Sequence, residues 1–324
     1  MSSTYAPPDR RGKIYDWRAA GLRYFTYRFF LKQTFAARVQ RVSISAGFTC
    51  PNVDGTVATG GCTFCDNRSF SPSRRIPRQE IRSQIDEGIR RLRIRYPDCE
   101  RFMAYFQPAT NTYAPVERLR AVYEEALSHP QVMALAIGTR ADCVPDDVLD
   151  LISELAERVY VSVEYGMQTM HNRSLDWMNR GHHHDVFIDA VERSRGRGFS
   201  IGAHVIIGLP GESRADHLAT ARELARLRVD AVKIHNLYVV QNTPLADQVE
   251  RGEVQLIDRD DYVESVVDTL EALPPDCVVE RISGEAPPKY FVGPSWCQNK
   301  PGVLQAIDAE LTRRDSWQGK LFEA

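Results

Sequence analysis

Runs of residues typical of buried strands alternate with amphipathic helical runs along most of this 324-residue chain. The strand-like runs are rich in β-branched and other apolar residues, and they cover 39–46, 101–107, 132–140, 159–166, 200–209 and 231–239. Helical runs lie between them and after them, at 78–95, 116–129, 146–157, 171–179, 184–197, 213–228 and 259–273. This alternation predicts an α/β fold with a parallel sheet, because parallel neighbours need a crossover connection.

Cysteine and polar residues gather at the carboxyl ends of these strands or in the loops that follow. Cys50 follows the first run, Gln107 the second and Arg140 the third, while Glu164 and Gln168 lie at the fourth. The turn at 208–212 follows the fifth run, and His235 lies on the sixth. A barrel collects its active-site residues at this one rim, whereas an open sheet uses only a switch point. A rim used by every strand therefore favours a barrel, complete or partial.

The chain divides into three parts by composition and pattern. Residues 1–38 form a basic and aromatic N-terminal extension, 39–275 form the barrel core, and 276–324 form a short C-terminal extension. The last part holds one further possible strand at 278–282 and a helix at 303–314.

Three cysteines, Cys50, Cys62 and Cys65, lie within 16 residues directly after the first strand. A structural zinc ion takes four ligands, while a site built for chemistry leaves a position open. Thiolates select zinc or iron–sulfur clusters, so three of them predict a four-iron cluster with one iron free for a ligand. The alternatives are a zinc knuckle completed by Asp54 or Asp66, and free thiols.

The seven cysteines are an odd number, and no run of about 18 apolar residues could span a bilayer. The polar start of the chain lacks the apolar segment of a signal peptide. We therefore expect reduced thiols, a cytoplasmic location and no membrane partner. The sequence does not fix the oligomeric state.

Charge is unevenly distributed along the chain. Residues 1–95 carry a formal charge of +11, and residues 96–324 carry −13. Aromatic residues interleave with the basic ones at the start, among them Trp17, Phe25 and Phe30. This pattern suits an arm that binds nucleic acid, but it equally suits an amphipathic helix whose aromatic residues pack on the core.

The cysteine loop resembles the cluster motif of radical S-adenosylmethionine (SAM) enzymes, although eleven residues, not the commoner three, separate its first two cysteines. Segments 46–52 and 60–65 are similar to the YhcC/YtqA-like subfamily, which is related to the Elp3 radical SAM domain. The likeness continues over nearly the whole chain, through 107–113, 138–143, 163–169, 179–182, 208–212, 233–235, 243–245 and 314–319.

This resemblance implies a partial (β/α)6 TIM-like barrel of the radical SAM type. It also implies a single [4Fe-4S] cluster held by Cys50, Cys62 and Cys65, with SAM bound at the open iron. Reductive cleavage of SAM would give a 5′-deoxyadenosyl radical that abstracts hydrogen from a substrate. A flavodoxin or ferredoxin type of protein is the expected electron donor.

The resemblance further implies which side chains contact SAM. Gln107 and Thr110 match the position that binds the methionine amino group, and Glu164 and Gln168 match the ribose position. Arg180 matches the arginine that pairs with the methionine carboxylate. As alternatives, Glu164 could pair only with Arg140, and Arg180 could only cap a helix.

Gly208 matches the turn that lies along the adenine, and Cys143 is a weak candidate for a catalytic residue that meets substrate. The leading hypothesis for the substrate is RNA, namely the wobble uridine of tRNA, bound through the basic N-terminal portion. The alternatives are a small metabolite or porphyrin-like substrate, and a non-catalytic protein that holds a cluster or zinc.

Overall fold

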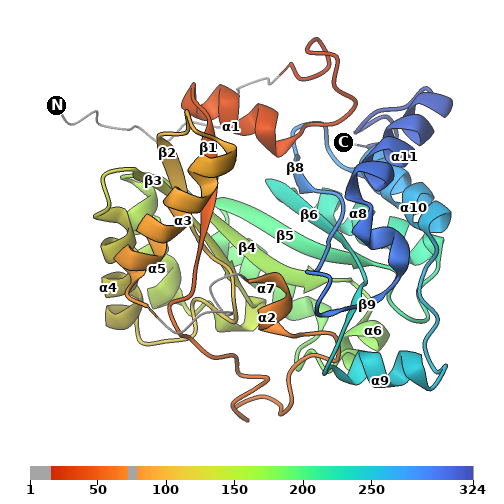
Figure 1. The fold of residues 1–324 in the computed structure, drawn as a ribbon, viewed down its shortest axis with the longest axis horizontal. Helices are drawn as coiled ribbons and strands as arrows, with labels where there is room; N and C mark the ends of the chain where they lie inside the picture. Colours follow the sequence, from red (N-terminus) through yellow and green to blue (C-terminus); the bar gives the residue numbers. More distant parts are fainter. Residues whose placement is uncertain (1–15, 72–78, 324) are drawn as a thin grey trace.

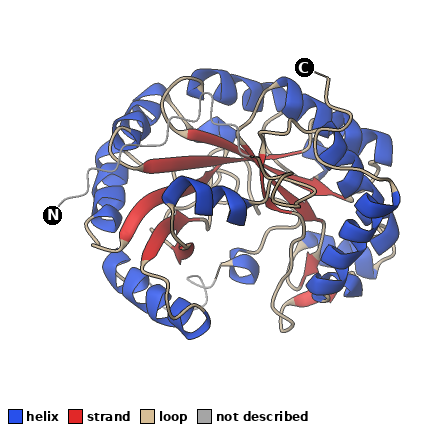
Figure 2. Cartoon of the chain, turned by 90° about the horizontal axis from the view of Figure 1, so that it is seen from above, coloured by secondary structure: helices blue, strands red, loops and turns tan. Residues whose placement is uncertain are grey.

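Seven parallel strands form one curled sheet in the computed structural model, which describes residues 16–71 and 79–323 (Figures 1 and 2). Along the sheet they are β1 (Val39–Ile44), β2 (Arg101–Phe106), β3 (Val132–Thr139), β4 (Tyr160–Gln168), β5 (Ser200–Ile207), β6 (Ala231–Asn236) and β8 (Val278–Arg281). The prediction of a partial barrel is confirmed. The sheet has seven strands instead of six, because β8 pairs with β6 and so joins the barrel from the predicted C-terminal extension.

Helices cover the outer face of the sheet, as Figure 2 shows from above. They are α3 (Ile81–Arg95), α4 (Val116–Leu127), α5 (Asp146–Ala156), α7 (His184–Ser194), α8 (Arg214–Arg226) and α10 (Arg259–Ala272). Their apolar faces and the outward-facing residues of the strands form one large buried cluster, with Ile44, Phe106 and Ile234 at its centre. This layer is the main core of the protein.

Smaller elements complete the chain at the two ends of the barrel and its open side. The helical ones are α1 (Tyr27–Phe35), α2 (Asn67–Phe70), α6 (Asn172–Trp177), α9 (Pro244–Glu250), α11 (Lys300–Arg313) and the short 3-10 segments Ala141–Cys143 and Ser295–Gln298. A two-stranded antiparallel sheet joins β7 (Val239–Val240) and β9 (Phe291–Gly293). No helix within 16–71 and 79–323 is long and apolar enough to cross a bilayer.

The segment before β1 closes the amino-terminal end of the barrel. Phe25, Phe30 and Phe35 are buried against inward-facing residues at the starts of the strands, including Met103 and Tyr160. Edge-to-face contacts of the kind that stabilise aromatic pairs link Phe35 to Tyr160, with ring centroids 5.6 Å apart. The aromatic stripe is therefore a core element, and the alternative of a stacking arm for nucleic acid is wrong for these residues. Residues 1–15 lie outside the described part of the chain.

The two ends of the described chain meet at this closed end. The amide of Gln318 donates to the carbonyls of Pro274 and Cys277, at 2.6 and 2.7 Å, and its oxygen accepts from the N–H of Phe25 at 2.8 Å. Trp17 Nε1 donates to the carbonyl of Pro275 at 2.9 Å. One buried glutamine thus ties both chain ends to the start of β8.

We expect Phe30→Ala to lower the free energy of unfolding by about 3–5 kcal/mol, because it removes a fully buried ring from the closed end. Denaturant unfolding followed by circular dichroism measures this loss. Phe29→Ala, at a half-buried position on the same helix, is the matched control and should cost clearly less. Equal losses for the two variants would contradict the assigned packing.

Candidate functional site

The cysteine loop, residues 45–66, follows β1 and lies across the carboxyl end of the barrel. Hydrogen bonds from its backbone reach three distant segments. The N–H of Thr110 donates to the carbonyl of Thr49 at 3.2 Å, the N–H of Thr63 donates to Met178 at 3.0 Å, and the N–H of Leu245 donates to Thr63 at 3.0 Å. Loops after β2, α6 and β7 therefore hold the cysteines over the lumen, which is the space enclosed by the strands.

Two asparagines fix the middle of the loop. Asn52, fully buried, donates through Nδ2 to the carbonyls of Asn179 and Arg180, at 2.5 and 3.0 Å. Asn179 donates in return to the carbonyls of Thr59 and Gly61, at 3.1 and 2.9 Å. This reciprocal pairing joins the loop to the segment that carries Arg180.

The sulfur atoms lie in a positively charged environment. Cys62 is buried, and its Sγ is 3.6 Å from Asn52 Nδ2 and 3.8 Å from Arg180 Nη1. Donors aimed at a sulfur atom are the arrangement that stabilises a metal-bound thiolate.

The three thiols do not form a site for one ion. Among the residues that the structure describes, no three His, Cys, Asp or Glu side chains are placed to hold a single metal ion. Asp54, the first candidate for a fourth zinc ligand, accepts hydrogen bonds from Thr56, with Oγ1 at 2.7 Å. The donor set of three thiols on a glycine-rich loop fits a larger group in which each cysteine binds a different metal atom.

Gln107 and Thr110 lie beside this loop, just after β2. Gln107 donates through Nε2 to Ser43 Oγ at 3.0 Å. Thr110 is 1% exposed, and its hydroxyl has no hydrogen-bond partner among the residues that the structure describes. A buried hydroxyl without a partner is costly, so Thr110 has the free acceptor and donor that a bound ligand could use.

Arg180 is buried, and no acidic partner is recorded for it in the described chain. Its Nη2 donates to the carbonyl of Gly166 at 2.7 Å, and its Nε has no partner. A Cβ atom at Gly166 would come within 2.9 Å of the guanidinium and 2.7 Å of Gln168 Nε2, so only glycine leaves room for both. The side chain points to the end of β4 and does not cap a helix, which excludes the alternative interpretation.

Gly208 ends β5 in the left-handed region, at φ +92°, and a Cβ there would meet Ile257 at 2.5 Å. Its N–H donates to His217 Nε2 at 3.2 Å, so the proton of that ring is on Nδ1, facing Ser265 Oγ at 3.1 Å. Burial lowers the pKa of His217 to about 4, which keeps the ring neutral and able to accept. His217 thereby positions the Gly208 turn.

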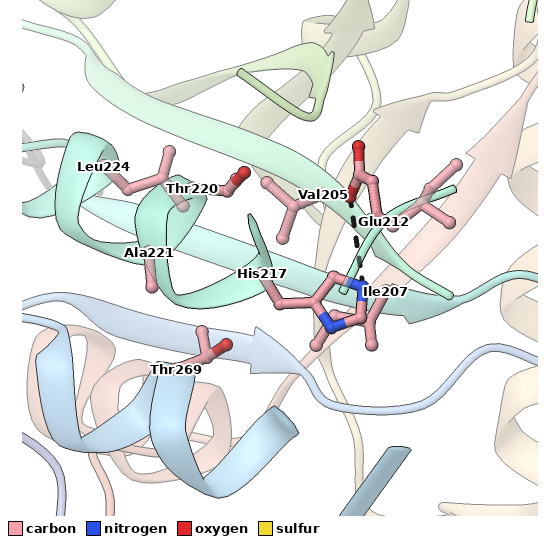
Figure 3. Close-up of a pocket in the computed structure, with 9 residues that line it drawn as sticks. Val205, Ile207, Glu212, His217, Thr220, Ala221, Leu224 and Thr269 are labelled. Atoms are coloured by element: carbon pink, nitrogen blue, oxygen red, sulfur yellow. Dashed lines mark ion pairs between the residues drawn. The ribbon is translucent and has the colours of Figure 1, made fainter. Parts of the chain in front are cut away.

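Figure 3 shows this histidine beside Glu212, in a small cavity between β5 and the helices α8 and α10. Glu212 Oε1 accepts from the hydroxyl of Thr169 at 2.7 Å, and burial raises its pKa. The cavity measures about 10 Å³ and has mostly aliphatic walls, which is room for about one water molecule. The cavity lies next to the residues that support the Gly208 turn, and it is too small for a cofactor.

Glu164 is placed differently from the expected ribose contact. It lies midway along β4 and is 1% exposed, below the rim. Its carboxylate forms ion pairs with Arg41, at 2.9 Å, and with Lys233, and it accepts hydrogen bonds from Tyr105 and His204, both at 2.9 Å. Tyr105, His204 and Lys233 all meet Oε2 from within the lumen, while Oε1 faces Arg41 and accepts no hydrogen bond from the described residues.

The alternative that Glu164 pairs only with Arg140 is wrong. Arg140 forms a two-point contact with Asp142, at 2.8 and 2.7 Å, and also donates to the carbonyl of Arg180 at 2.9 Å. Cys143 follows in the same 3-10 turn and is buried, with its Sγ 3.5 Å from Asp142 Oδ1. Burial and Asp142 raise the pKa of the Cys143 thiol, which makes it a poor nucleophile.

A second glutamate, Glu280 on β8, completes the buried network. It lies 2.9 Å from Arg41 and 3.3 Å from Lys233, but no hydrogen bond to either of its oxygens is recorded. Burial and the neighbouring Glu164 raise its pKa, whereas Arg41, Lys233 and His204 overcome the effect of burial and hold the pKa of Glu164 well below its ordinary value.

Sequence reasoning missed this network, apart from Glu164 and His235. A signal was present in the sequence. Polar residues at 41 and 43 of β1, and at 233 and 235 of β6, alternate with apolar ones, which places the polar side chains together on the inner face.

Comparison with known proteins adds independent information. The sequence profile described as Radical SAM superfamily matches residues 55–224, and that of the Radical_SAM C-terminal domain matches 229–313. YtqA of Bacillus subtilis (strain 168) is 41% identical over 93% of this chain and 93% of its own. YhcC of Escherichia coli (strain K12) is 36% identical over 87% of this chain and 90% of its own.

More distant relatives share part of the chain. The tRNA uridine(34) acetyltransferase of Methanocaldococcus jannaschii is 26% identical over 49% of this chain and 30% of its own length. The solved structure of Methanocaldococcus infernus Elp3 with an N-terminal deletion superposes with a TM-score of 0.65 at 18% identity, over 87% of this chain and 64% of that chain. At this identity, the structural likeness shows the fold alone.

The two buried glutamates provide a matched test of the network. Glu164→Gln should lower the free energy of unfolding at pH 7 by about 3–5 kcal/mol, because Arg41 and Lys233 lose their ionised partner. Glu280→Gln should cost much less, since burial already disfavours the charged form of Glu280. Denaturant unfolding of both variants measures the contrast, and equal losses would contradict the assignment.

The same variants give a pH dependence. The pKa of Glu164 is lower in the folded chain than its ordinary value of 4.5, so its stabilising contribution is present above that value and disappears as the pH falls below it. The gap in stability between the wild type and Glu164→Gln should therefore narrow below about pH 4.5. A gap that widens on acidification would have the wrong sign.

Proposed function

Because this chain belongs to the radical SAM superfamily, we propose that Cys50, Cys62 and Cys65 hold a [4Fe-4S] cluster, that the rim above the lumen binds SAM, and that the substrate is a nucleoside of RNA. The superfamily implies an enzyme with this cluster and cofactor. The predicted likeness to YtqA and YhcC is confirmed by the comparisons. When both are bound, the cluster and SAM would supply a 5′-deoxyadenosyl radical that abstracts a hydrogen atom from the substrate.

One observation carries the proposal: three cysteines on one loop lie across the carboxyl end of a half-barrel, with a buried arginine donating to a sulfur atom. Arg180 has no carboxylate partner in the described chain. Its guanidinium can therefore pair with a thiolate and also with the carboxylate of a ligand. Asn52 donates to the same sulfur and fixes the loop. Arg180 and Asn52 thus place hydrogen-bond donors at the buried sulfur of Cys62.

The rim supplies groups suited to the methionine and ribose parts of SAM. The free hydroxyl of Thr110 and the amide oxygen of Gln107 can accept from an amino group, and Arg180 can bind a carboxylate. Gln168 lies next to Arg180 over Gly166, where it can contact a ribose hydroxyl. Gly208, in the left-handed turn after β5, provides the backbone that would lie along the adenine.

Glu164 takes a different part in this scheme. Its position in the lumen network suits support of the site from below, and we assign the ribose contact to Gln168 alone. The exposed Cys65 marks the side of the loop from which an electron donor of the flavodoxin or ferredoxin type can approach.

Two observations support an RNA substrate, and specifically a tRNA uridine. A partial relative carries the name tRNA uridine(34) acetyltransferase. The lumen wall offers hydrogen-bonding side chains, among them His204 and His235, as a polar nucleobase requires. The N-terminal aromatic residues are buried at the opposite end of the barrel, so they cannot stack on the bases of an RNA. This favours a second candidate substrate, a small polar metabolite.

Cys62→Ala should lose bound iron after anaerobic reconstitution, because it removes one of three thiol ligands. The wild type should hold about four irons and four sulfides per chain. Cys99→Ala changes a buried cysteine outside the loop and is the matched control, so it should keep its iron. Full iron content in Cys62→Ala would refute the ligand assignment.

The activity is tested in two steps. Reduced, reconstituted protein should release 5′-deoxyadenosine from SAM, and Arg180→Gln should weaken SAM binding by about tenfold or more. Nucleoside mass spectrometry of tRNA from a strain that lacks the protein should then show one modified uridine missing. Cofactor cleavage with an unchanged tRNA nucleoside profile would exclude the RNA substrate and leave the metabolite.

A further inference from the structure

The polar groups of the lumen are arranged in layers above the closed end. Glu164, Lys233 and Glu280 are almost completely buried, with side-chain exposures of 1, 6 and 2%. His204 lies on the same inner face, in register with Lys233, but its side chain is 22% exposed, and His235 lies one step closer to the open end. Histidine side chains therefore form the surface that a molecule entering the lumen would meet.

His235 lies next to His204, with ring centroids 5.5 Å apart. Its Nε2 atom is shielded from solvent and has no hydrogen-bond partner among the described residues. Burial, followed by the positive charge of Arg281, lowers the pKa of His235 well below its ordinary value, so the ring is neutral. An unmade hydrogen bond at a buried nitrogen is a cost that a bound group could remove.

Arg281 is brought to the same face by an irregularity in the sheet. Val232 pairs with Val279, but Lys233 pairs with Arg281, so a bulge at Glu280 shifts the register of β8. Residues paired across neighbouring strands share a face, and Arg281 therefore lies on the lumen side together with Lys233. It is exposed at the edge strand, and no ion pair is recorded for it within the described residues.

The charges on this face do not balance. Arg41, Lys233 and Arg281 are cationic, while Glu164 and Glu280 are the acidic groups. Burial raises the pKa of Glu280, which reduces the negative charge on this face, and it also lowers the pKa of Lys233, which reduces the positive charge. Burial, followed by the charge of Lys233, lowers the pKa of the nearby imidazole of His204 to about 4.

We propose that His235 and Arg281 form an anion-binding subsite in the barrel lumen, which takes up a phosphate or carboxylate group of the substrate. Arg281 supplies the charged fork, and His235 supplies a neutral N–H donor next to it. The subsite predicts an anionic group on the substrate. Only the identity of the molecule that carries this group rests on the proposed function. A phosphate is the source that an RNA substrate would provide.

Calorimetric titration of the reconstituted, full-length protein tests the subsite with two probe pairs. The first pair is uridine 5′-monophosphate against uridine, and the second is glutarate against glutaramide. Wild-type protein should bind the anionic member of at least one pair about tenfold or more tightly. Arg281→Gln and His235→Leu should remove this preference, while Arg222→Gln, an exposed position on α8, should keep it.

The outcomes separate the subsite from the proposed substrate. A preference for the monophosphate that depends on Arg281 supports both. A preference for glutarate alone, with the same dependence, supports the subsite and counts against RNA. No preference in either pair, or equal loss in Arg222→Gln, overturns the subsite and leaves cofactor cleavage unaffected. Unchanged iron content and circular dichroism confirm that the variants are folded.

Discussion

A single buried carboxylate, that of Glu164, holds the inner face of this half-barrel together. Its partners Arg41, Tyr105, His204 and Lys233 come from β1, β2, β5 and β6, so one side chain connects strands from the edge of the sheet to beyond its middle. Arg41 and Lys233 extend the network to β8 through Glu280. A curled sheet with an open side has no complete ring of strands to fix its curvature, and these ion pairs supply that constraint from inside. The desolvation of such a network is costly, and the contacts to Oε2 of Glu164 compensate it only in part, since Oε1 of Glu164 and both oxygens of Glu280 accept no hydrogen bond from the described residues.

The two ends of the lumen are chemically opposite. The aromatic residues of the N-terminal segment seal the starts of the strands, while the cysteine loop, Thr110 and Arg180 surround the other end. A substrate can therefore enter only from the cysteine end or the open side. The buried network lies between the apolar floor and the rim, so an entering group meets histidines and charge before it reaches that floor. This order of layers favours a polar substrate group over an apolar one.

The sequence predicted the strands, the cysteine loop and the barrel well because each has a local pattern. Apolar periodicity identifies strands such as β3 and β5, and cysteine spacing identifies the loop, without any knowledge of the fold. The position of β8 was less predictable, since 278–282 is short and becomes a barrel strand only by pairing with β6. The burial of Phe25, Phe30 and Phe35 likewise depends on a distant surface, which interleaved basic and aromatic residues cannot reveal. Glu164 was found as an unusual residue, but its partners come from four strands that only the folded sheet brings together.

The position of Arg180 connects the lumen to the cysteine loop. Its guanidinium contacts the end of β4 through Gly166 and a sulfur atom through Cys62, while its carbonyl accepts from Asn52 and Arg140. A buried cation whose recorded partners are only a carbonyl and a thiol is poorly compensated, and this favours negative charge next to it. In the proposed function, the anions next to Arg180 are the cysteine thiolates and the carboxylate of SAM. Arg180 would thus stabilise the thiolate form of the cysteines and also orient SAM. One side chain therefore links the structure of the cysteine loop to cofactor binding.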